Sequence, residues 1–203
     1  MAVLLWRGKA SHEEPEGLVA VFFRAAPSEL RAHFFDYLGR LLSAQHITVT
    51  EEVKERLQKL WEWRLQTLSA LPEAERRPEL DAFGWWFSSG KLDLDWSLGQ
   101  CAEVLKLNPS IDHQRMVVRR LRECATLRPA ETLACLVALL RDERAAWKVC
   151  WSSTAREAVR EILIAVLATD SDDLRASARG VIDRLGSLGY LEFGELVGVR
   201  VPG

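Results

Sequence analysis

The segment Leu80-Asp-Ala-Phe-Gly-Trp-Trp-Phe-Ser-Ser-Gly-Lys-Leu-Asp-Leu-Asp-Trp96 decides the fold of this 203-residue chain. It holds five aromatic residues, and apolar side chains recur at helical spacing from Leu80 to Phe87. Trp85 and Trp86 point to the other sides of the same helix, which makes this helix apolar nearly all round. Such a helix is usually buried between neighbours on both sides. The segment therefore predicts a central helix in a stacked helical array.

Signals of helix starts and ends divide the rest of the chain, and no stretch shows the sustained alternation of a strand. The expected helices pair over segments of roughly 30–40 residues, the length of HEAT-like two-helix repeats. The sequence predicts an all-α, HEAT-like α-solenoid of about five helical hairpins, with a compact helical bundle as the alternative. The pairs cover approximately residues 11–46, 50–89, 93–128, 129–169 and 170–200.

Two local features carry separate expectations. The segment from Pro72 to Pro78 is polar and bounded by prolines, which are disfavoured inside helices, so we expect a connector there. Trp147 and Trp151 lie one turn apart in a short segment that is either irregular or helical. We expect these two tryptophans to fill a junction in the core, although exposed tryptophans are also typical binding anchors.

The N-terminal end suggests that this chain belongs to a longer protein. Residues 2–6 are apolar without a preceding N-cap residue, and the run stops at Gly8, a signal of a helix end. We expect these residues to be the last turns of a helix that starts upstream. Ser11 to Glu14 then forms a capping box for the next helix. The expected organisation is a single helical-repeat domain over residues 1–203, forming the C-terminal part of a larger chain.

Composition limits the environment and the partners of the protein. Hydrophobic residues make up 48% and charged residues 28%, values typical of a globular protein. The net charge of -2 gives no overall attraction to nucleic acid or anionic membranes, and no apolar run approaches the length of a membrane span. The four cysteines are dispersed, and no signal peptide is evident, which predicts buried thiols and a cytoplasmic location.

Tryptophans supply the first candidate interaction residues. Trp63, Trp85 and Trp86 are candidates because exposed tryptophans dominate many protein interfaces. Packing between helix layers is the alternative role, and it is the commoner one for large aromatic side chains. Trp63 is the hardest of the three to bury, because it lies opposite the apolar stripe of its helix.

Arginines supply the second candidate surface. Arg115, Arg119 and Arg122 follow one another at helical spacing, and this stripe suits the recognition of phosphates or acidic peptides. The alternative is a solvated helix face whose charges are balanced by acids on neighbouring helices. Between Asp112 and Arg184 basic residues only slightly outnumber acidic ones, which favours the alternative.

No pattern in the sequence indicates catalysis. Asp93 and Asp95 are explained by their place at a helix start, where acids cap the backbone and complement its dipole. The histidines are scattered without metal-ligand spacing, and nucleophile motifs and phosphate-binding loops are missing. We therefore expect no catalytic, cofactor or metal site.

Three groups of residues together resemble a known type of bacterial protein. They are Leu5 to Gly8 with Ala26 to Leu30, Leu60 to Trp63 with Phe83 to Gly90, and Arg184 to Gly186 with Gly189 to Phe193. This set resembles the C-terminal HEAT-like helical region of large, mostly uncharacterised bacterial proteins. Some of those carry P-loop NTPase or other effector modules upstream and have apparent links to phage defence. The resemblance implies a region that senses, scaffolds or oligomerises.

The functional expectation is a non-catalytic protein-interaction, scaffold or regulatory domain. Its partner would be another protein or an upstream domain of the same parent chain. The first alternative is a nucleic-acid-binding helical repeat that uses the stripe from Arg115 to Arg122. The second alternative is a small enzyme, which requires titratable groups that converge in a pocket.

Overall fold

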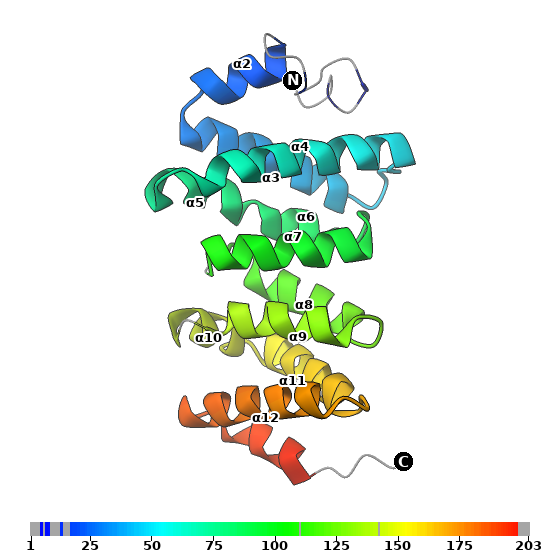
Figure 1. Ribbon diagram of the computed structural model, residues 1–203, viewed down its shortest axis with the longest axis vertical. Helices are drawn as coiled ribbons and strands as arrows, with labels where there is room; N and C mark the ends of the chain where they lie inside the picture. Colours follow the sequence, from blue (N-terminus) through cyan, green and yellow to red (C-terminus); the bar gives the residue numbers. More distant parts are fainter. Residues whose placement is uncertain are drawn as a thin grey trace. The chain divides into compact units, whose positions relative to one another are not determined.

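The computed structural model describes residues 5, 7–8, 13, 17–109, 111–141 and 143–198. These residues form helices and no strand, which confirms the all-α expectation (Figure 1). The α-helices are α2 (Leu18–Ala25), α3 (Ser28–Ser43), α4 (Glu51–Ser69), α5 (Glu73–Asp81), α6 (Phe83–Ser88), α7 (Leu94–Leu107), α8 (Gln114–Cys124), α9 (Pro129–Leu139), α10 (Glu143–Cys150), α11 (Ser153–Leu167) and α12 (Asp172–Ser187), followed by the 3-10 helix η1 (Leu191–Gly198).

The chain divides into two compact units. Unit 1 comprises residues 1–97 and 111–113, and unit 2 comprises residues 98–110 and 114–203. Several helix starts follow the sequence signals: the Thr50 side chain accepts a hydrogen bond from the Val53 amide, and Ser171 accepts one from the Leu174 amide. Pro129 occupies the first turn of α9, where its missing N–H costs nothing.

An aromatic cluster forms the core of unit 1. The side chains of Phe35, Trp61, Phe83 and Trp86 are fully buried. The Trp61 ring centroid lies 4.7 Å from that of Phe83, 5.1 Å from that of Phe35 and 5.4 Å from that of Trp86. The Trp86 indole N–H also donates a 2.9 Å hydrogen bond to the Phe35 carbonyl. Because such rings bury large apolar areas, this cluster anchors α6 against α3 and α4.

The prediction of a connector between Pro72 and Pro78 is wrong, because residues 73–81 form the helix α5. Pro72 takes the N-cap position, and Pro78 lies inside the helix, where it removes one backbone donor. The expected aromatic helix is also shorter than the sequence indicates: Leu80 belongs to α5, and α6 begins only at Phe83. Tertiary packing of α5 against α3 overrides the local preference of the prolines.

Two glycines allow the helices of unit 1 to approach closely. A Cβ on Gly39 of α3 would lie 2.5 Å from the Cβ of Trp85, and one on Gly84 would lie 2.3 Å from the Asp112 carbonyl oxygen. Both separations are far below van der Waals contact. Gly84 therefore allows a backbone approach that a residue with a Cβ would block.

Helices α8, α9 and α11 pack on one another in unit 2, with α12 against α9 and α11 and with α10 against α8 and α11. Their facing positions are apolar and fully buried, for example Val118, Leu136 and Ile162. All four cysteines are buried and free, as the sequence predicted. A hydrogen bond with Cys135 and burial raise the pKa of the Cys101 thiol well above its ordinary value, so this thiol stays neutral.

Most of the N-terminal prediction lies outside the described residues. This applies to the capping box from Ser11 to Glu14 and to residues 2–4 and 6. Leu5 is helical and fully buried, and Gly8 has a φ of +70°, the conformation expected where a helix ends. Within the described ranges, no helix has the length and apolar character needed to cross a lipid bilayer.

Candidate interaction surface

The three tryptophans singled out from the sequence differ in exposure. Trp86 is fully buried in the aromatic core, so it is a packing residue and cannot be an interaction anchor in this structure. Trp85 is partly exposed and contacts His113 at a ring-centroid distance of 4.4 Å, with the Arg40 guanidinium 5.5 Å from its ring centre. Trp63 is also partly exposed, and its ring meets Phe23 edge to face at 5.5 Å.

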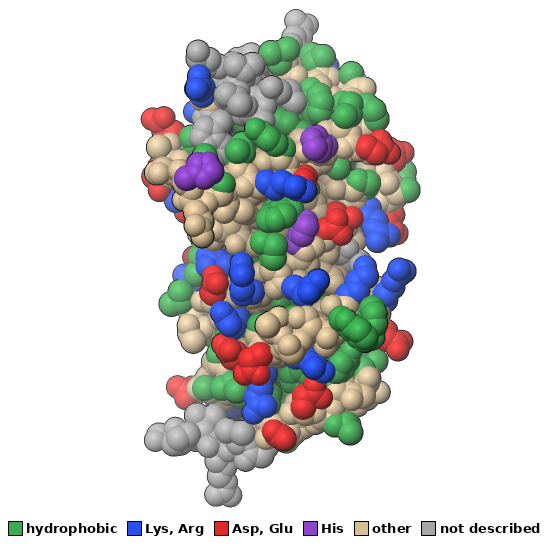
Figure 2. All heavy atoms as spheres, turned by 180° about the vertical axis from the view of Figure 1, so that it is seen from behind, with side chains coloured by type: hydrophobic (Ala, Val, Ile, Leu, Met, Phe, Trp, Pro, Cys, Tyr) green, Lys and Arg blue, Asp and Glu red, His purple; other side chains and the backbone are tan. Residues whose placement is uncertain are grey.

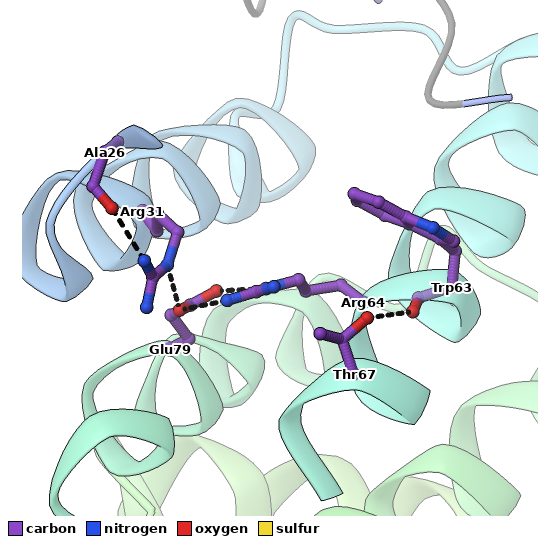
Figure 3. A network of polar contacts seen from close by, with 6 residues as sticks. All are labelled: Ala26, Arg31, Trp63, Arg64, Thr67 and Glu79. Carbon is purple, nitrogen blue, oxygen red and sulfur yellow. Dashed lines mark hydrogen bonds and ion pairs between the residues drawn. The ribbon is translucent and has the colours of Figure 1, made fainter. Parts of the chain in front are cut away.

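A buried ionic network lies beside Trp63 and was not predicted (Figure 3). Glu79 of α5 is completely buried and accepts hydrogen bonds from Arg64 at 2.7 and 2.8 Å and from Arg31 at 2.6 Å. Arg31 also donates to the Ala26 carbonyl. A single carboxylate thus joins α3, α4 and α5, and its surroundings are closed to solvent. We assign this network a structural role, because nothing outside the fold can reach the carboxylate.

The arginine stripe of α8 is only partly available for binding. Arg122 pairs with Glu161 of α11 at 3.6 Å, and the neighbouring Arg120 pairs with Glu123 at 2.8 Å. Arg115 and Arg119 are exposed and form no ion pair within the part of the chain that the structure describes. Glu123 of α8 and Glu161 of α11 therefore neutralise part of this basic surface.

Asp93, one of the two carboxylates considered for acid–base chemistry, is engaged in an ion pair. Asp93 accepts hydrogen bonds from Lys54 at 2.9 Å and from Gln58 at 3.2 Å. The Lys54 ammonium, with a further contribution from Gln58, lowers the pKa of the Asp93 carboxyl. Asp36 pairs with Arg40 at 2.7 Å. Among the described residues, no group of three or more His, Cys, Asp or Glu side chains is arranged to hold a metal ion.

Among the residues that the structure describes, the most exposed aromatic side chains are those of Trp147 and Trp151 in unit 2. Their side chains are 52% and 71% exposed, and their ring centroids lie 4.9 Å apart. The expectation that they fill a core junction is wrong. Helix α10 buries Ala146, Val149 and Cys150 against the unit, and this leaves the two tryptophans on its outer side. Figure 2 shows a hydrophobic cluster over α10 beside Lys and Arg side chains.

A pocket opens directly beside this pair, and we call it the tryptophan pocket. Its volume is about 360 Å³, and it is lined by Trp147, Cys150, Trp151, Arg156, Leu188, Gly189 and Tyr190. Burial raises the pKa of the Cys150 thiol to about 11 and also raises the pKa of the Tyr190 phenol. Both groups are therefore neutral at pH 7, and Arg156 is the charged residue of the lining.

A second, more apolar depression lies next to the first, and we call it the α9–α12 groove. It has a volume of about 340 Å³ and is lined by Val137, Leu140, Ser177, Gly180, Val181, Arg184, Leu185 and Leu188. Leu188 belongs to both linings, so the groove and the tryptophan pocket adjoin each other. The groove could not be predicted from the sequence. Its walls come from α9 and α12, and the packing of these two helices against each other is decided by tertiary contacts.

Comparisons of the chain with models of protein families, with curated proteins and with solved structures found no match. The geometry of this surface offers an exposed pair of contacting tryptophan rings and two adjoining depressions with arginine as their charged residue.

Proposed function

We propose that this chain is a non-catalytic interaction domain, which scaffolds or regulates a larger bacterial protein through contacts with another protein or with upstream domains. The observation that carries the proposal is the exposed pair of Trp147 and Trp151, whose rings contact each other at a tilt of 43° beside a pocket. The expected architecture, a HEAT-like stack of helical hairpins, is supported by the packing of consecutive helices such as α8 on α9 and α11 on α12.

The exposure of these two rings is energetically unfavourable in the isolated chain. Tryptophan side chains are highly buried on average, and the transfer of each ring from water into an interface gains several kcal/mol, by the order-of-magnitude rule of ~25 cal/mol per Å². A tryptophan side chain has only two χ angles, so its ordering on binding costs little conformational entropy. Tryptophan is among the residues most enriched at the centres of protein interfaces. A protein partner that covers the two rings would gain the free energy of their burial at a low cost in conformational entropy.

The test uses a double variant of the full-length protein in which both tryptophan side chains are removed. We expect Trp147→Ala combined with Trp151→Ala to reduce the recovery of a specific partner by at least about tenfold in affinity purification with quantitative mass spectrometry. Circular dichroism should show an unchanged fold, because both side chains point to solvent. Leu127→Ala is the matched control, since Leu127 is a 63% exposed hydrophobic residue of the same unit. An unchanged list of partners for the double variant would contradict the proposal.

A second candidate function is the binding of single-stranded nucleic acid. Arg115 and Arg119 are exposed without an ion pair among the described residues, and exposed tryptophans can stack on bases. This candidate predicts that the affinity for a fluorescent oligonucleotide falls steeply between about 50 and 200 mM salt. It further predicts that Arg119→Glu weakens this binding. Equal binding by wild type and Arg119→Glu would eliminate it.

A further inference from the structure

The α9–α12 groove is open enough to accept a side chain from outside. Gly180 of α12 faces no atom within 4 Å of the place where a Cβ would stand, and Val137 of α9 is 42% exposed. The floor is closed by Leu140, Val181 and Leu185, which are buried. A volume of about 340 Å³ exceeds what one leucine or phenylalanine side chain needs. The groove thus presents an apolar socket on the surface of unit 2.

The charged residues that line the two depressions are arginines. Arg184 lines the groove and Arg156 lines the tryptophan pocket, and neither lining includes an Asp or Glu side chain. The Arg184 guanidinium is oriented by a hydrogen bond to the Arg141 carbonyl, and within the described ranges its remaining donors are open to a ligand. Arg156 pairs with Glu192 at 3.4 Å, but both side chains are partly exposed, at 39% and 46%. Such an exposed pair contributes little to stability. Arg156 can therefore exchange Glu192 for a carboxylate of a ligand.

We propose that the α9–α12 groove and the tryptophan pocket together bind an acidic amphipathic segment of the protein partner. This proposal rests on the proposed function and specifies the chemistry of the partner. An apolar side chain of the segment enters the groove beside Gly180, and a second one covers Trp147 and Trp151. Carboxylates of the segment pair with Arg184 and Arg156. An amphipathic helix presents apolar side chains on one face and can carry acidic side chains at the edges of that face.

The linings favour a peptide over a nucleic acid. The groove is walled mainly by aliphatic side chains, and these match leucine or phenylalanine better than a nucleobase, whose edge carries several polar atoms that need partners. Besides Arg184, the groove lining contains one polar side chain, that of Ser177. Nucleic-acid binding would instead draw on the exposed arginines of α8, Arg115 and Arg119, which lie outside both linings.

The test selects ligands without assuming their sequence. Random phage-displayed peptides of about 16 residues, four turns of helix, are selected on the purified full chain, and the best peptide is measured by fluorescence polarisation. We expect selected peptides to be acidic, with Leu, Phe or Trp repeating at intervals of three or four. Gly180→Leu should fill the groove and weaken binding of this peptide by at least about tenfold, while raising Tm, because leucine favours a helix more than glycine does.

Matched controls come from the same unit. Gly99→Leu makes the same substitution in α7, where an added Cβ also meets no atom within 4 Å. Arg179→Glu makes the same charge change as Arg184→Glu on the same helix but outside the groove lining. We expect both controls to keep the peptide affinity within about twofold of wild type, and Arg184→Glu to weaken it by about tenfold or more.

The outcomes separate this inference from the function on which it rests. Selection of neutral or basic peptides would overturn the inference, and so would binding that Gly180→Leu and Arg184→Glu leave unchanged. If the Trp147→Ala and Trp151→Ala double variant abolishes that same binding, the interaction function stands and only the assigned chemistry fails. If that double variant also binds normally, both fail. An oligonucleotide that competes with the selected peptide, and that loses affinity on Arg184→Glu, would likewise overturn the inference.

Discussion

Replacement of Glu79 by alanine is expected to lower the free energy of unfolding by about 3–5 kcal/mol. Glu79 is completely buried, and the Arg64 side chain that binds it twice is only 4% exposed. Without the carboxylate, Arg64 would keep a positive charge inside unit 1 with no opposite charge to compensate it. Arg31, which is 12% exposed, would lose its partner too. The large effect therefore comes from the charges that are left behind, more than from the bonds that are lost.

Urea denaturation followed by circular dichroism measures this effect, and two variants make the result specific. Glu103→Ala removes the acid of an exposed pair with Lys106, and we expect a change of less than about 1 kcal/mol. A double variant with Glu79→Leu and Arg64→Met removes both buried charges and should recover much of the stability that Glu79→Ala loses. If Glu79→Ala cost as little as Glu103→Ala, the network of Figure 3 would not be a closed, buried one.

Much of the helical framework could be predicted from local signals. Thr50, Pro129 and Ser171 stand where helices begin, and no segment carried the alternation of a strand. The prediction failed where tertiary contacts decide the outcome. Pro78 argued against a helix, yet α5 forms because Glu79 binds arginines of α3 and α4. No sequence pattern predicts that one acidic residue in a polar segment will be buried against arginines of two other helices.

The candidate surface was less predictable than the framework, because exposure depends on which face of a helix finds a neighbour. For both Trp86 and Trp151 the sequence left burial and binding open as alternatives, but one is fully buried and the other is 71% exposed. A signal was available for Trp147 and Trp151: Ala146, Val149 and Cys150 form an apolar stripe that excludes both tryptophans from the buried face of α10. Gly180 gave no comparable signal, because an isolated glycine in a helix is compatible with contact or with open space.

Phe87→Ala is expected to lower the free energy of unfolding by about 3–5 kcal/mol, the usual cost of emptying a core position of this size. Phe87 is 1% exposed in α6, the short helix that packs against α3. At six residues, α6 is too short to be stable by itself, so its position depends on what its side chains bury. The loss of one ring should thus weaken the attachment of the whole segment and leave a cavity in unit 1.

The same denaturation measurement tests this prediction, with two comparisons that isolate burial as the cause. Phe87→Leu keeps most of the apolar volume and should cost about 1.5 kcal/mol or less. Tyr37→Ala removes an aromatic side chain that is 43% exposed on α3, and its cost should also be well below that of Phe87→Ala. A cost of less than about 1 kcal/mol for Phe87→Ala would place the core elsewhere. The segment from Leu80 to Trp96 would then not be the centre on which the helices of unit 1 are assembled.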